Sequence, residues 1–78
     1  MGTNWKKAPL TDYSIARISL AEGGYNYYCY IHSQGQIIIQ RGNVAETEYK
    51  YADGGIRDNL DSIWVQRTGL TYVDRDEI

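Results

Sequence analysis

YNYYCYIHSQGQIIIQR, residues 25–41, is the stretch that decides the fold. It holds two runs rich in aromatic and β-branched residues, Tyr25 to His32 and Gln36 to Gln40, separated by Ser33-Gln34-Gly35. Such runs are typical of strands, and a glycine between them readily accepts the positive φ that a tight turn requires. The stretch therefore predicts a β-hairpin.

The length of the hairpin loop determines which side chains share a face. A two-residue loop, Gln34-Gly35, places Ile31 opposite Ile38, and directly opposed residues lie on the same face. The inner face is then predicted to carry Tyr27, Cys29, Ile31 and Ile38, and the outer face Tyr28, Tyr30, His32, Ile37, Ile39 and Arg41. A shift of one residue would exchange the two sets.

The segment from Leu10 to Glu22 shows both helical and alternating apolar spacing. Gly23-Gly24 follows it, and a glycine pair between two apolar runs is typical of a two-residue hairpin turn. The turn favours a strand over a helix. It also predicts that one side of this strand joins the inner face, with Ala16, Ile18 and Leu20, while Arg17 joins the outer face.

Two further elements follow the hairpin. Glu46 to Ala52 alternates Thr and Tyr with charged residues, which predicts a half-buried strand that adds Tyr49 and Tyr51 to the inner face. Asp53-Gly54-Gly55 is predicted to end this strand. From about Asp58 to Gln66 the apolar residues form one helical stripe, which is predicted to cover the inner face with Leu60, Ile63 and Trp64.

These elements predict an α+β fold that is mostly β, a four- to five-stranded antiparallel meander with one short C-terminal helix packed on one face. The fifth strand would be Leu70 to Val73. We expect one domain over residues 10–73, an N-terminal arm over residues 1–9 and a charged, solvated tail over residues 74–78. The predicted core is Ala16, Ile18, Leu20, Tyr27, Cys29, Ile31, Ile38, Tyr49, Tyr51, Leu60, Ile63 and Trp64.

Composition narrows the function classes. A chain of 78 residues forms a small core, so assembly is a natural source of additional stability. Eight basic residues against ten acidic ones give a net charge of -2, which disfavours a general binder of nucleic acid or membrane surfaces. No run is apolar enough for a signal peptide or a membrane span, and a single cysteine forms no internal disulfide. We therefore expect a cytoplasmic protein.

Few residues suggest catalysis or metal binding. Cys29 and His32 are the single members of their types, but three positions apart on a strand they point to opposite faces. A thiolate-imidazole pair is thus not expected, and the scattered aspartates match no ligand spacing for a metal. The sequence predicts no enzyme, cofactor, metal or small-molecule ligand. A small enzyme that uses Cys29 or His32 is the third interpretation.

The predicted outer face is the remaining candidate site. It gathers tyrosines and isoleucines with charged residues around them, a pattern typical of protein interfaces: Tyr28, Tyr30, His32, Ile37, Ile39, Arg41 and Arg17. We expect a non-catalytic interaction module that forms a homo-oligomer, with a dimer as the first hypothesis, or binds another protein. Trp5 in the arm is expected to pack on the sheet or on a neighbouring subunit.

Single-stranded nucleic acid is the alternative partner, because aromatic residues near arginines on an open sheet can stack bases. The size of the chain is also common among accessory proteins of phages and mobile elements, although no residue supports that origin. The predicted sorting of faces has a direct consequence: Ile39→Glu should split an oligomer, whereas Ile18→Glu should unfold the protein by burying an unpaired charge.

Overall fold

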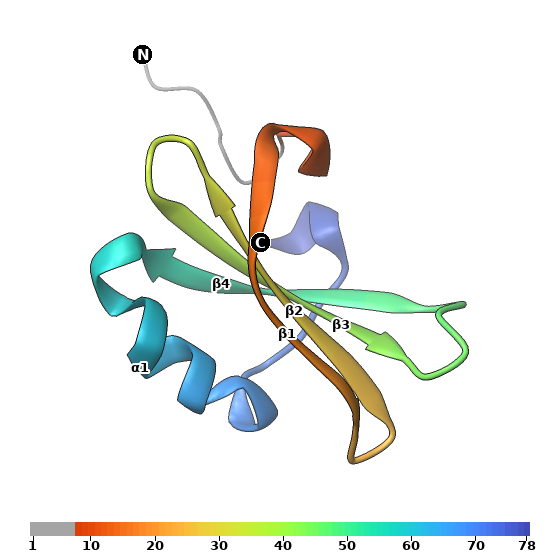
Figure 1. Ribbon diagram of the computed structural model, residues 1–78. Helices are drawn as coiled ribbons and strands as arrows, with labels where there is room; N and C mark the ends of the chain where they lie inside the picture. Colours follow the sequence, from red (N-terminus) through yellow and green to blue (C-terminus); the bar gives the residue numbers. More distant parts are fainter. Residues whose placement is uncertain (1–7) are drawn as a thin grey trace.

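A computed structural model describes residues 8–78 of the chain. It shows a four-stranded antiparallel sheet in the order β1-β2-β3-β4, followed by one short helix, α1 (Figure 1). The predicted mostly-β meander with a C-terminal helix is confirmed. The strands are β1 Tyr13–Glu22, β2 Tyr25–His32, β3 Gln36–Asn43 and β4 Tyr49–Ile56, and α1 is Leu60–Val65.

Short 3-10 turns complete the described chain. They precede β1, flank α1 and close the C-terminus: η2 Leu10–Asp12, η3 Arg57–Asn59, η4 Arg67–Gly69 and η5 Arg75–Glu77. The predicted fifth strand is not formed within the described residues. In its place, Val73 alone bridges to Tyr51 at the edge of β4. Residues 1–7 of the predicted arm, with Trp5, lie outside the described residues.

The β2–β3 hairpin differs from its predicted register by one residue. Its loop has three residues, Ser33-Gln34-Gly35, and Ile31 pairs with Ile37 instead of Ile38. Gly35 has a φ of 99° and its amide donates to the His32 carbonyl over 2.8 Å, which is the geometry of a three-residue loop that ends in a left-handed glycine. The shift exchanges the predicted faces of β3 as a block.

The β1–β2 turn has the predicted two-residue loop, with positive φ at Gly23 and Gly24 and Glu22 paired with Tyr25. Beyond the turn, however, β1 is irregular. Its register shifts between Ser19 and Glu22, where Ala21 has a φ of 56°, and again between Ile15 and Arg17. A bulge adds one residue to one strand and so reverses the direction of the side chains beyond it.

The first bulge changes the faces predicted for β1. Arg17, and not Ile18, pairs with Cys29, and Ile18 pairs with Tyr28 on the other face. Ile18 and Leu20 are 54% and 63% exposed, so their prediction as core residues is wrong. Ala16 lies in the second bulge, between Ile15 and Arg17, and its side chain packs against the buried cluster of the sheet, on the same side as Cys29.

β4 begins and ends later than predicted. It starts at Tyr49 and continues through Asp53-Gly54-Gly55, which are part of the strand and do not end it. A register shift at this point makes room for close packing: a Cβ on Gly54 would lie 2.5 Å from Cγ2 of Ile37. The glycine pair therefore marks a bulge where two backbones approach, one of the roles of glycine within strands.

One face of the sheet, here called the helix face, is covered by α1. Its fully buried centre is Cys29, Ile37 and Ile39, against which pack Ala16, Ile31, Leu60, Ile63, Trp64, Leu70 and Tyr72. Tyr27, another predicted core residue, is buried on this face against Tyr72. The apolar stripe of α1 thus covers the face of the β2–β3 hairpin that carries Cys29, which is the face that the sequence assigned to the helix.

The other face, here called the open face, is covered near one end by the C-terminal segment. Arg75 lies over the rings of Tyr13 and Tyr51, at 5.8 and 5.6 Å from their centroids, and Nη2 donates to the Ala8 carbonyl over 2.6 Å. Figure 1 follows this segment from α1 to η5. The predicted solvated tail is therefore wrong for Arg75, which is half-buried.

Three predicted core residues belong to the open face. Ile38 is fully buried there, Tyr51 is half-buried, and Tyr49 is exposed. Gln40, next to them, is buried and its Nε2 donates to the Tyr51 hydroxyl over 3.0 Å. The open face thus has a partly buried centre of its own, in addition to the core under α1.

Candidate interaction surface

The residues predicted as one interface lie on two faces. Alternation along β2 places Tyr28, Tyr30 and His32 on the open face, whereas Ile37 and Ile39 are 0% exposed beneath α1. The prediction of these two isoleucines as surface residues is wrong. Its cause is the hairpin loop, which has three residues where the sequence suggested two.

The two arginines of the predicted interface also lie on the helix face. Nη2 of Arg17 is 3.0 Å from Oδ1 of Asp61 on α1, and the guanidinium of Arg41 contacts the Tyr72 ring. Neither side chain borders Tyr28 or Tyr30, so the predicted surface of tyrosines and arginines is not formed.

A different apolar surface appears on β1. Ile15 and Ile18 are 51% and 54% exposed, and they pair across the sheet with Tyr30 and Tyr28. The rings of the two tyrosines, both half-buried, lie 6.5 Å apart. These four side chains form one surface on the open face, here called the β1 patch: Ile15, Ile18, Tyr28 and Tyr30.

Glu46 fixes one border of the β1 patch. Its carboxylate accepts hydrogen bonds from the hydroxyls of Tyr28 and Tyr49, over 3.2 and 2.9 Å, and from the Asn26 amide over 3.2 Å. Burial and the hydrogen bond to Glu46 raise the pKa of Tyr28. The Tyr28 hydroxyl therefore stays protonated and keeps its ring in one orientation.

The loop that carries Glu46 is itself fixed. Glu46 has a φ of 57°, in the left-handed region that non-glycine residues rarely adopt. Asn43 holds the loop: its Oδ1 accepts from the amides of Thr47 and Glu48, over 2.8 and 3.1 Å. An uncommon backbone conformation is thus maintained by local hydrogen bonds, and it directs the Glu46 carboxylate toward the tyrosines.

Cys29 and His32 do not form a catalytic pair. Cys29 is fully buried on the helix face, and burial raises its thiol pKa to about 11. His32 lies on the open face with its ring against Tyr13, 5.1 Å between centroids, and its Nδ1 accepts from the Gln34 amide over 3.2 Å. A buried, protonated thiol is a poor nucleophile.

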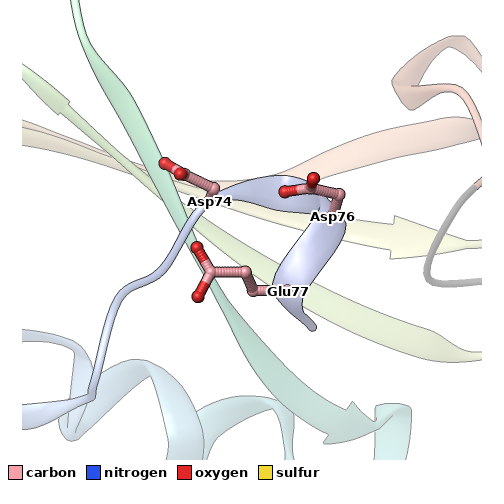
Figure 2. A group of neighbouring side chains, drawn as sticks. All are labelled: Asp74, Asp76 and Glu77. Carbon is pink, nitrogen blue, oxygen red and sulfur yellow. The ribbon is translucent and has the colours of Figure 1, made fainter.

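Three carboxylates gather at the C-terminus, and Figure 2 shows them around η5. Their oxygens, from Asp74, Asp76 and Glu77, lie within 4.8 Å of one another. All three residues are exposed, and Asp74 accepts a hydrogen bond from Nζ of Lys50 over 2.7 Å. This bond lowers the pKa of Asp74. Lys50 already supplies a positive charge to these carboxylates, and their exposure is that of an ordinary solvated surface.

An open, polar groove lies between the bulge of β4 and α1. Its lining consists of Asp53, Gly54, Gly55, Asn59, Ser62, Ile63 and Gln66. Three of its polar side chains take part in hydrogen bonds within the groove: Asp53 accepts from the Gly55 amide over 2.9 Å, and Gln66 donates to Ser62 over 3.3 Å. The lining offers no nucleophile paired with a base.

Across residues 8–78, no helix has both the length and the apolar character required to cross a membrane. Comparisons of the chain with protein-family models, with curated proteins and with solved structures gave no match.

Proposed function

We propose that this protein is a small, non-catalytic interaction module that self-associates through the β1 patch, with a dimer as the first hypothesis. The observation that carries the proposal is the exposure of Ile15 and Ile18 beside two oriented tyrosines on a strand that pairs only with β2 in the described chain. Adjacent exposed apolar residues mark interaction sites more often than single ones do.

The composition of the β1 patch favours a second copy of the chain as the partner. Its four side chains carry no charge, so two copies can meet without repulsion between like charges, and isologous contacts of this kind are the commonest in homo-oligomers. Tyrosine is also enriched at interfaces because its ring is apolar while its hydroxyl keeps a polar partner, here Glu46 for Tyr28.

The two bulges of β1 favour contact through side chains over pairing of strand edges. Each shift interrupts the row of backbone groups that a second strand would need. Bulges at an edge are a common way in which proteins prevent extension of a sheet. We therefore expect two copies to pack face to face, with Ile15 and Ile18 of one against the tyrosines of the other.

Single-stranded nucleic acid was the alternative expected from the sequence. It required arginines beside the tyrosines, but Arg17 and Arg41 lie on the helix face, and Glu46 borders the β1 patch. No observation now favours this alternative over self-association.

The proposal is tested by the mass in solution of the double variant Ile15→Glu/Ile18→Glu, measured by sedimentation velocity beside the wild-type chain. We expect the wild type to sediment as a dimer at high concentration and the variant as a monomer, with the same circular dichroism. Both positions are exposed, so the charges do not disturb the core.

Val65→Glu provides the matched control. Val65 is 76% exposed on α1 and the substitution adds the same type of charge far from β1 in the sequence and on another element. This variant should still dimerise. Dissociation by Val65→Glu as well as by the double variant, or a wild type that stays monomeric, would refute the β1 patch as the interface.

A further inference from the structure

Arg41 occupies an unusual position on the helix face. Its guanidinium carbon lies 4.4 Å from the centroid of the Tyr25 ring and 4.5 Å from that of the Tyr72 ring. The side chain is half-buried between these rings. Contact with two aromatic faces satisfies the flat sides of a guanidinium by cation-π interaction, but it leaves the N–H groups at the edge of the plane without acceptors.

The rings that hold Arg41 are themselves held. The Tyr72 hydroxyl donates to the Arg67 carbonyl over 2.6 Å, and its ring packs 6.1 Å from that of Tyr27, which is buried. Tyr25 contacts Tyr27 edge-on at 6.3 Å. The guanidinium is therefore held by a cluster of tyrosines in a restricted orientation.

Three other arginines of the described chain, Arg17, Arg67 and Arg75, donate to oxygen acceptors, and the exposed Arg57 lacks both an acceptor and the tyrosine rings that hold Arg41. Arg67 forms a two-pronged pair with Glu22, over 2.9 and 3.0 Å, and Arg17 pairs with Asp61 over 3.0 Å. Within residues 8–78, the side chain of Arg41 makes no hydrogen bond or ion pair. The edge of the Arg41 guanidinium therefore has no protein acceptor among the described residues.

The donors of Arg41 also reach the surface. Among the described residues, Gln36 Oε1 is the one buried side-chain oxygen or nitrogen without a hydrogen-bond partner. The guanidinium nitrogens of Arg41 also lack a partner, and because they are not among the buried atoms, they are open to solvent. Lys50 on β4 lies opposite Arg41 on β3 in the sheet, so a second positive group is nearby. The ammonium group of Lys50 forms an ion pair with Asp74.

We infer that Arg41 is a binding site for a small oxyanion, a phosphate or a carboxylate, which its guanidinium edge would hold through two parallel N–H···O bonds. A planar fork fits both anions in this way, and prior orientation by the tyrosines reduces the entropy that binding would cost. The site lies on the opposite side of the sheet from the β1 patch and does not depend on self-association.

The test is a titration of the ¹⁵N-labelled protein with inorganic phosphate and, separately, with acetate, while the Nε–Hε resonances of the arginines are recorded. Sodium chloride at the same ionic strength is the reference. We expect a saturable shift of the Arg41 resonance with phosphate, acetate or both, and the relative affinities will identify the preferred anion. Arg57, which is exposed and has no ion pair in the described chain, is the internal control.

Arg41→Gln should weaken the binding of the preferred anion by about tenfold or more, because hydrogen bonds to a charged group are lost. Arg57→Gln should leave the affinity unchanged, and Arg41→Lys, which keeps the charge but not the fork, provides a second variant if Arg41→Gln folds poorly. Equal, non-saturating shifts at Arg41 and Arg57 would mean an adventitious ion only and would overturn the assignment.

Discussion

The isoleucines of the central strand β3 and those of the edge strand β1 have opposite environments. Ile37, Ile38 and Ile39 are 0% exposed although they alternate between the two faces, whereas Ile15 and Ile18 are about half exposed. The residue type is the same in both strands. The difference shows that burial in this sheet is decided by what covers each strand.

Both faces of β3 have cover. α1 packs over Ile37 and Ile39, and on the open face, where Ile38 is fully buried, the C-terminal segment lies over the rings of Tyr13 and Tyr51. β1 lies at the end of the strand order, and its bulges turn Ile18 away from α1. An edge strand with bulges and exposed isoleucines is thus stable within the fold yet available for contact with another copy.

The largest expected effect on stability separates the two strands directly. Ile39→Ala should lower the free energy of unfolding by about 2–5 kcal/mol, because it leaves a cavity beneath α1. Ile18→Ala should change it by less than about 0.5 kcal/mol in the monomer, as is usual for exposed positions. Urea unfolding at low protein concentration measures both values. Similar losses of stability for the two variants would contradict the burial of Ile39 and the exposure of Ile18.

The same comparison applies to charge. The sequence alone predicted that Ile18→Glu unfolds the chain and that Ile39→Glu leaves it folded, and the structure reverses both expectations. Ile39→Glu would bury a carboxylate without a partner, which a small core does not tolerate. Circular dichroism should show an unfolded Ile39→Glu variant and a folded Ile18→Glu variant.

A smaller effect is expected where β3 meets β4. Gly54→Ala places a Cβ 2.5 Å from Cγ2 of the buried Ile37, so the strands must separate. Overpacking of this type costs about 1–3 kcal/mol. Gly69→Ala is the matched control, because no atom lies within 4 Å of the added Cβ. Thermal unfolding should show a lower midpoint for Gly54→Ala alone.

The smallest expected effect concerns the attachment of the β1–β2 hairpin to η4. Hydrogen bonds from Arg67 and from Ser19 lower the pKa of Glu22. Because the folded pKa lies below the unfolded one, this pair stabilises the fold above the ordinary glutamate pKa of 4.5, and the contribution is lost as pH falls through the folded value.

Glu22→Gln removes this contribution. Its difference in stability from the wild type should therefore be largest near neutral pH and shrink toward zero in acid, as measured by urea unfolding at several pH values. A difference that stays constant with pH would show that the ionised carboxylate of Glu22 does not stabilise the fold.

Much of the fold could be predicted from local sequence patterns, whereas the side chains that lie on each face of the sheet could not. Gly23-Gly24 and the apolar stripe of α1 are explicit in the sequence, and they identified the first turn and the helix. Gly35 also indicated a turn, but a glycine after two polar residues is compatible with loops of two or three residues. The one additional loop residue places Ile37 and Ile39 on the helix face and Ile38 on the open face, the reverse of the predicted arrangement.

The candidate site was harder to predict, because the β1 patch depends on two bulges. Ala21 adopts a positive φ and Ala16 interrupts the pairing, yet neither alanine differs in sequence from an ordinary strand residue. Tyr28 and Tyr30 were placed together from their alternation alone, and the structure has them side by side. Ile15 and Ile18 joined them only through tertiary structure.

The most direct test of self-association through the β1 patch is an isotope-filtered nuclear Overhauser experiment on a mixture of labelled and unlabelled chains. Contacts between copies should appear from the methyl groups of Ile15 and Ile18 to the rings of Tyr28 and Tyr30, and Val65 should show none. Intermolecular contacts at α1 instead of β1, or none in a sample concentrated enough to dimerise, would contradict the account.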